Sequence, residues 1–118
     1  MKIAATINNN NYIDKLPDGP YIFIYDSNNK KIEKNINPGF SLKENRRSAV
    51  VDFLISKRVD CVITVPEAFC SISYEKAKKN GIKFIKLNKS MPYKNVLDNI
   101  ALYINNITDE IPEEELNK

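Results

Sequence analysis

The sequence of 118 residues is long enough for one domain with a single hydrophobic core and too short for two. Apolar residues make up 42% and charged residues 28%, which excludes an intrinsically disordered chain. Eighteen Lys and Arg against fifteen Asp and Glu give a net charge of only +3, and their spread along the chain argues against a nucleic-acid partner. No apolar run approaches the roughly 20 residues that a membrane span needs, so we expect a cytoplasmic protein with no membrane partner.

Three extended segments are predicted at the start of the chain. Lys2–Ile7 is apolar and β-branched, and it stops at the four asparagines of Asn8–Asn11, which is typical of a strand that enters a loop. Tyr21–Tyr25 has the aromatic and isoleucine content of a second strand. Turn-forming residues 26–29 connect it to Lys31–Ile36, where Ile32, Lys34 and Ile36 alternate with Glu33 and Asn35, so the two runs are predicted to form a β-hairpin.

A first helix is predicted after the hairpin. Ser41 and Glu44 have the S-x-x-E spacing of a capping box, which favours a helix that begins there and continues to about Lys57. The residues expected on its buried stripe are Val50, Phe53 and Leu54.

Strands alternate with helices in the second half of the chain. Cys61–Val65 is the continuous apolar run of a central strand covered on both faces, so Cys61 is predicted to lie in the core. Ser73–Asn80 is predicted to be a short helix, and Ile82–Leu87 a further strand. Apolar residues then recur at helical spacing over residues 92–107, which predicts a third helix.

The order of these elements predicts the architecture. Strands that alternate with helices favour right-handed crossovers and parallel pairing, while the early hairpin adds an antiparallel strand. We therefore predict an α/β fold in three layers, α/β/α, around a mixed five-stranded sheet. Residues 1–107 are expected to form this single domain, and the acidic residues 108–118 a flexible tail.

Five segments carry a resemblance to a known family. They are Met1–Ala4, Pro20–Asp26, Asn37-Pro38, Val59–Ile63 and Tyr74–Lys83. In this order they resemble the opening strand, the second strand, the post-hairpin turn, the central strand and a helix-to-strand junction of the dinitrogenase iron-molybdenum cofactor biosynthesis family, which includes NifX, NafY and the carboxy-terminal domain of NifB. The resemblance covers roughly residues 1–107. It implies a ribonuclease H-like motif and a role in carrying or inserting iron-sulfur and iron-molybdenum precursors of nitrogenase.

The chain departs from this family where metal is held. Family members commonly have a His-Phe-Gly-Arg-like motif before the second strand, where this chain has Leu16-Pro17-Asp18-Gly19. They also tend to carry a Gly-His or Gly-rich loop after the central strand, where this chain has Glu67-Ala68-Phe69-Cys70. Because the sequence contains no histidine, cluster binding by the family's usual ligands does not transfer. An iron-molybdenum or iron-sulfur species is implied by the resemblance alone.

A candidate site is predicted where parallel strands end, because open α/β sheets bind ligands at the carboxyl ends of their strands. The predicted residues lie in the loops after Lys2–Ile7 and after Cys61–Val65, and they are Asn10, Asn11, Tyr12, Cys70, Ser71 and Ser73. Cys70 is the only soft metal ligand among them, and one thiol is a poor site because zinc and iron-sulfur centres want about four ligands. An inert thiol packed at a helix start is the simpler interpretation of Cys70.

A second group of residues offers an alternative position for a ligand. Lys43, Arg46 and Arg47 near a helix N-terminus are able to attract an anion, or they form a solvated helix face.

The sequence lacks the elements of the expected enzyme classes. A two-metal nuclease needs an acidic residue on the first strand, and Lys2–Ile7 has none. There is also no histidine base for a nucleophile and no phosphate-binding glycine loop. We therefore predict a non-catalytic binding module for a small anionic ligand or metal species. The alternative is an interaction or regulatory module with a protein partner and a vestigial cofactor cleft.

Overall fold

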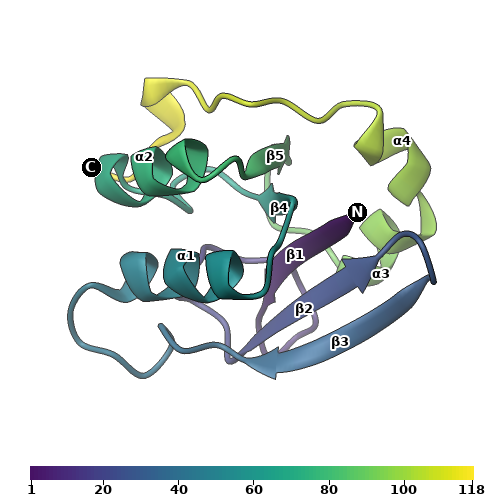
Figure 1. Cartoon of the computed structure of the whole chain (residues 1–118). Coiled ribbons are helices and arrows are strands. Elements are labelled where there is room, and N and C mark those ends of the chain that lie inside the picture. The colour runs from purple at the N-terminus through teal and green to yellow at the C-terminus, as the bar shows by residue number, and fades with distance from the viewer.

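A mixed five-stranded sheet with helices on both of its faces organises the chain, and the computed structural model describes residues 1–118 (Figure 1). The elements are, in chain order, β1 (Lys2–Ile7), β2 (Tyr21–Asp26), β3 (Lys31–Ile36), α1 (Arg46–Ser56), β4 (Cys61–Thr64), α2 (Ser71–Lys79), β5 (Lys83–Lys86), α3 (Tyr93–Asp98), α4 (Ile100–Ile104) and a short 3-10 helix, η1 (Glu113–Glu115). The strands lie in the order β3-β2-β1-β4-β5, and β1 pairs antiparallel with β2 and parallel with β4. The predicted α/β fold with its mixed five-stranded, ribonuclease H-like sheet is confirmed.

Different helices cover the two faces of the sheet. The helices α1 and α2 contact each other on one face, and α3 and α4 lie on the other (Figure 1). Side chains of β2 alternate accordingly, because Ile22 and Ile24 are buried on the α1 face while the ring of Phe23 meets Tyr93 of α3 edge-on, with centroids 5.3 Å apart. The central strands β1 and β4 are buried along nearly their whole length, as strands covered on both faces must be. No helix has the length and apolar character needed to cross a membrane.

The first helix begins later than the sequence predicts. Ser41 and Glu44 form no capping box, and α1 starts at Arg46 after Asn45, whose φ of 54° is left-handed. The guanidinium of Arg46 donates to the carbonyl oxygen of Gly39 at 3.0 Å. This bond holds the segment before the helix as a loop, which overrides the local capping signal.

The helix predicted over residues 92–107 is two short helices instead of one. The helices α3 and α4 meet at Asn99, whose φ of −119° departs from helical geometry. The side-chain amide of Asn99 donates to the carbonyl oxygen of Asn95 at 2.9 Å. Asparagine side chains compete with the backbone for such bonds, which accounts for the break.

The segment Thr108–Lys118, here called the C-terminal strap, is docked on the domain, whereas its sequence suggests a flexible tail. It runs from α4 to the vicinity of α2 (Figure 1). The backbone of Thr108 exchanges hydrogen bonds of 2.8 and 2.9 Å with Phe84 at the edge of β5. Further along, Ile111 and Leu116 are buried, with only 7% and 8% exposed. Three of the five acidic side chains of the strap form ion pairs, which are Lys78–Glu110, Lys86–Glu115 and Lys118–Glu113.

One buried polar side chain joins two loops near the carboxyl ends of β1 and β3. Asn37 is 1% exposed, and its Nδ2 donates to the carbonyl oxygens of Leu16 and Gly19 at 2.8 and 2.9 Å. Its Oδ1 accepts the N–H of Gly39 at 2.9 Å. This side chain therefore fixes the loop after β1 against the loop that leads to α1.

The substitution Asn37→Ala is expected to lower the free energy of unfolding by roughly 1–3 kcal/mol, because buried backbone groups lose their partners. Urea unfolding followed by circular dichroism measures this loss. Asn35→Ala is the matched control, since the side-chain amide of Asn35 makes only long bonds of 3.4 and 3.5 Å. Equal losses in the two variants would contradict the role given to Asn37.

Candidate functional site

A hollow between the first turns of α1 and α2, here called the basic pocket, is the candidate site. Its volume is about 330 Å³, which is within the range of small-molecule sites. The residues that line it are Lys43, Asn45, Arg46, Arg47, Ser48, Cys70, Ile72 and Ser73. Three of them are cationic and none is acidic.

Both helices begin at this end because of the direction of the strands before them. The strand β3 runs in the same direction as β1, since each pairs antiparallel with β2, and β4 is parallel to β1. The carboxyl ends of β3 and β4 therefore lie at the same edge of the sheet, and the helices that follow them present their amino ends there.

The first N–H groups of α1 have no hydrogen-bond acceptor within the protein. The N–H of Ala49 bonds to the carbonyl oxygen of Asn45 at 3.0 Å, and the Asn45 side chain provides no cap. The N–H groups of Arg46, Arg47 and Ser48 are left open. Open N–H groups and the positive end of the helix dipole together favour an anion at this position.

Two arginines add positive charge that no carboxylate neutralises. The guanidinium of Arg46 donates to the carbonyl oxygen of Pro17 at 2.9 Å. That of Arg47 donates to the carbonyl oxygens of Ala68 and Glu67 at 2.9 and 3.1 Å. Neither arginine takes part in an ion pair. The carbonyl oxygens orient the guanidinium groups without cancelling their charge, so the pocket is positive.

Cys70 caps the start of α2 together with Ser73. The N–H of Cys70 donates to the hydroxyl oxygen of Ser73 at 3.0 Å, and the thiol and hydroxyl lie 3.2 Å apart. Burial alone would raise the pKa of the Cys70 thiol, but hydrogen bonds from Ser73 and Ile72 and the charge of Arg47 outweigh it and lower the pKa. Burial in β4, by contrast, raises the pKa of the Cys61 thiol to about 12, and Cys61 lies in the core as predicted.

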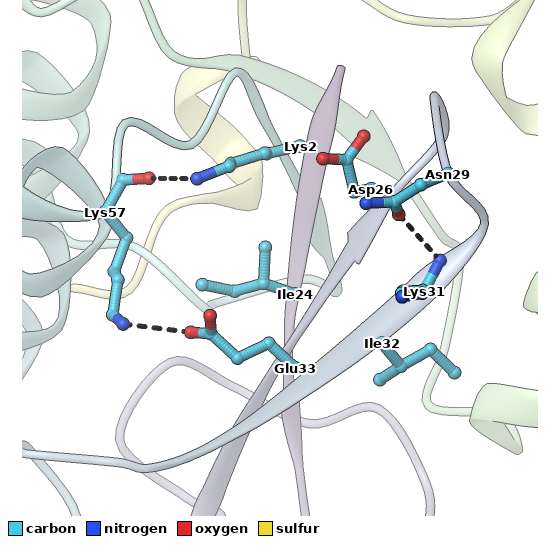
Figure 2. Close-up of a pocket in the computed structure, with 8 residues that line it drawn as sticks. All are labelled: Lys2, Ile24, Asp26, Asn29, Lys31, Ile32, Glu33 and Lys57. Atoms are coloured by element: carbon cyan, nitrogen blue, oxygen red, sulfur yellow. Dashed lines mark hydrogen bonds and ion pairs between the residues drawn. The ribbon is translucent and has the colours of Figure 1, made fainter.

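The opposite end of α1 carries a hollow of about 380 Å³ that contains one ion pair (Figure 2). The Nζ of Lys57 lies 2.9 Å from Glu33 Oε2, and the Nζ of Lys2 donates to the carbonyl oxygen of Lys57 at 3.3 Å. The hydrogen bond from Lys57 lowers the pKa of Glu33. Lysines here also complement the negative end of the helix dipole. Two carboxylates therefore offset most of the charge of the three lysines in this hollow, whereas no carboxylate lines the basic pocket.

The six residues predicted from strand ends fall into separate places. Cys70 and Ser73 line the basic pocket, and Ser71 lines a neighbouring hollow beside the strap. Asn10 and Asn11 line an apolar groove next to α3 on the other side of the sheet. The structure therefore does not bring the two predicted groups into one cleft.

The asparagine loop after β1 has an internal structural role. The side-chain oxygen of Asn8 accepts the N–H groups of Asn10 and Tyr12 at 2.9 and 3.1 Å. Asn11 is left-handed with φ 62°, and Tyr12 is exposed. The run satisfies its own turn, as asparagines commonly do.

The basic pocket combines two groups that the sequence leaves separate. Cys70 and Ser73 were predicted as site residues because they follow a parallel strand. Lys43, Arg46 and Arg47 were predicted as an alternative position for an anion. The other lining residues were missed because no local pattern marks them, and they are Asn45, Ser48 and Ile72.

The donor set of the pocket does not fit a metal centre held by protein ligands. Cys70 is its only thiol, and no group of three or more His, Cys, Asp or Glu side chains lies together in the structure. Structural zinc and iron-sulfur centres want about four such ligands.

Comparison with known proteins identifies the fold. No protein-family model and no curated protein matches the sequence. The apo form of the orange protein from Desulfovibrio gigas is similar in structure, with a TM-score of 0.74 and 12% identity over 91% of this chain and 90% of that one. A NifB-like protein from Thermotoga, which belongs to the DUF35 family, gives a TM-score of 0.66 and 18% identity over 86% and 87% of the two chains. At these identities the likeness establishes a shared fold.

Cys70 is expected to react with iodoacetamide at a lower pH than an ordinary thiol, while Cys61 stays unmodified in the folded protein. Arg47→Gln is expected to move the pH midpoint of Cys70 alkylation upward, because it removes a charge that stabilises the thiolate. Arg47→Lys keeps that charge and is expected to move it less. The rate of modification against pH is measured by mass spectrometry.

Lys31→Gln is the control, since it removes the same charge from the hollow at the other end of α1. If the two variants have the same pH midpoint of Cys70 alkylation, Arg47 does not stabilise the thiolate.

Proposed function

We propose that the protein is a non-catalytic binding module for a small anion, which it holds in the basic pocket. The observation that carries this proposal is the uncompensated positive charge of the pocket. Three cationic side chains and three open N–H groups meet there, and no acidic residue lines it. Fixed donors and unneutralised charge in a hollow favour an anion over a neutral ligand or a cation.

The donors suit a tetrahedral oxyanion such as phosphate or molybdate. The Oγ of Ser48 accepts a hydrogen bond from Lys76 at 2.7 Å, which leaves its own hydrogen free to donate to a ligand. The guanidinium of Arg47 supplies planar paired donors that match the edge of an oxyanion. The pocket contains no carboxylate or histidine to act as general acid or base, which supports binding without catalysis.

We further propose that the chain is a divergent member of the dinitrogenase iron-molybdenum cofactor biosynthesis family. The strand order and the structural likeness to the NifB-like protein support this assignment. In this chain, however, the side chains at the site offer positive charge in place of metal ligands. A metal-containing cargo would therefore be bound as an anion, through its outer oxygen or sulfur atoms, and not by ligation of its metal.

Titration of the protein with phosphate and with molybdate, followed by backbone amide chemical shifts, tests the proposal. We expect saturable shifts at residues 46–48 and 70–73, and weaker binding at high ionic strength because salt screens the charges. Arg47→Gln is expected to weaken binding about tenfold or more, because hydrogen bonds to charged groups contribute roughly 1.5–3 kcal/mol.

Lys31→Gln is again the control and is expected to leave the affinity unchanged. Shifts confined to the asparagine loop Asn8–Tyr12 would place the ligand elsewhere. If neither anion binds, the proposal fails, and the alternative of an interaction or regulatory module takes its place.

A further inference from the structure

The C-terminal strap is bonded to the loop that connects β4 to α2, which includes Glu67, Ala68 and Phe69. The N–H of Glu67 donates to the carbonyl oxygen of Glu115 at 2.8 Å, and the N–H of Asn117 donates to that of Phe69 at 2.7 Å. Cys70 and Asn117 form a parallel bridge of β type. The strap therefore lines the outer side of the loop that delivers Cys70 to the basic pocket.

Arg47 holds the same loop from the other side. It bonds the carbonyl oxygens of Glu67 and Ala68, while the strap takes the N–H of Glu67 and the carbonyl oxygen of Phe69. Three successive residues are thus fixed between the arginine and the strap. A movement of the strap would therefore move the loop and, through it, the Arg47 guanidinium.

The loop needs this support because one of its residues is strained. Glu67 is left-handed with φ 67°, a conformation that costs a residue other than glycine roughly 1–2 kcal/mol. Such a conformation persists where the surroundings over-determine it. The bonds from Arg47 and from Glu115 act on the two peptide groups that flank this residue.

The strap is in turn held by its own side chains next to these bonds. Leu116, which lies between Glu115 and Asn117 in the sequence, is buried. The carboxylate of Glu115 forms an ion pair with Lys86 at 3.2 Å. Ile111 is buried to a similar degree but lies at the other end of the strap, where its N–H bonds to the hydroxyl of Tyr74 at 3.1 Å.

We propose that Glu115, Leu116 and Asn117 are positioning residues for the basic pocket. They hold the β4–α2 loop so that the Arg47 guanidinium and the start of α2 face one ligand. The inference rests on the proposed anion site, and it adds that affinity is set in part by residues that do not touch the anion. Loosening the strap lowers the affinity although every group that contacts the ligand is retained.

The sharpest test compares Asn117→Pro with Asn117→Ala. Proline removes the N–H that bonds to Phe69, and it is compatible with the extended Leu116 before it, while alanine keeps the N–H. We expect Asn117→Pro to weaken phosphate binding at least threefold and to raise the pH midpoint of Cys70 alkylation, and Asn117→Ala to leave both near wild type. Equal behaviour of the two variants would overturn the proposal.

A second pair separates positioning from stability. Leu116→Ala and Ile111→Ala remove comparable buried side chains from the two ends of the strap. Both are expected to lower the urea midpoint, but only Leu116→Ala is expected to change phosphate affinity and the Cys70 midpoint, and Leu116→Met is expected to restore them. If the effects on Cys70 follow stability in both variants alike, the strap contributes stability alone.

The two hypotheses fail in distinguishable ways. Absence of phosphate binding by the wild-type protein defeats the anion site, and the Cys70 midpoint then decides the role of the strap by itself. An upward shift in Asn117→Pro without a shift in Asn117→Ala supports the positioning of the loop. A midpoint that stays fixed in both variants overturns it.

Discussion

The site end of this molecule depends on two consecutive arginines in the first turn of α1. Adjacent residues of a helix point about 100° apart, so the two side chains leave the helix toward different loops. Arg46 reaches Pro17 and Gly39, and Arg47 reaches the β4–α2 loop. Their donors satisfy carbonyl oxygens in segments that are far apart in the sequence. The loops around the pocket are therefore all hydrogen-bonded to the amino end of α1.

The same bonds decide the electrostatics of the pocket. An arginine paired with a carboxylate contributes order but little net charge, whereas one that donates to carbonyl oxygens keeps its full charge, because guanidinium does not lose its proton in proteins. The two ends of α1 show the difference. At the carboxyl end, Lys57 is balanced by Glu33 and by the helix dipole. At the amino end, both arginines add to the positive end of the dipole, and the excess charge is available to a ligand.

The sequence predicts the sheet well because its signals are local and strong. The apolar runs of β1 and β4 and the aromatic and isoleucine run of β2 mark strands whatever surrounds them. The strap was missed because Ile111 and Leu116 are isolated among acidic residues and form no period. The residues of the basic pocket were predicted as two separate groups, because Arg47 and Ala68 are 21 residues apart in the sequence. Only the folded chain places the Arg47 Nε 2.9 Å from the carbonyl oxygen of Ala68. The asparagine loop was assigned to the site because strand-end reasoning does not reveal that Asn8 satisfies its neighbours.

A pocket that binds by charge places different demands on its scaffold than one that ligates a metal. Coordination bonds are short and strong, so a few well-placed histidines or thiolates fix the ligand by themselves. Hydrogen bonds from guanidinium and N–H groups weaken steeply when distance or angle departs from the optimum, and several must act together. The residues that line the basic pocket come from the starts of two helices, and the Arg47 guanidinium is bonded to the strained residue Glu67 in the loop between them. Support for that loop from Arg47 and from the strap is what the proposed anion site requires, because each donor is effective only while the others keep their place.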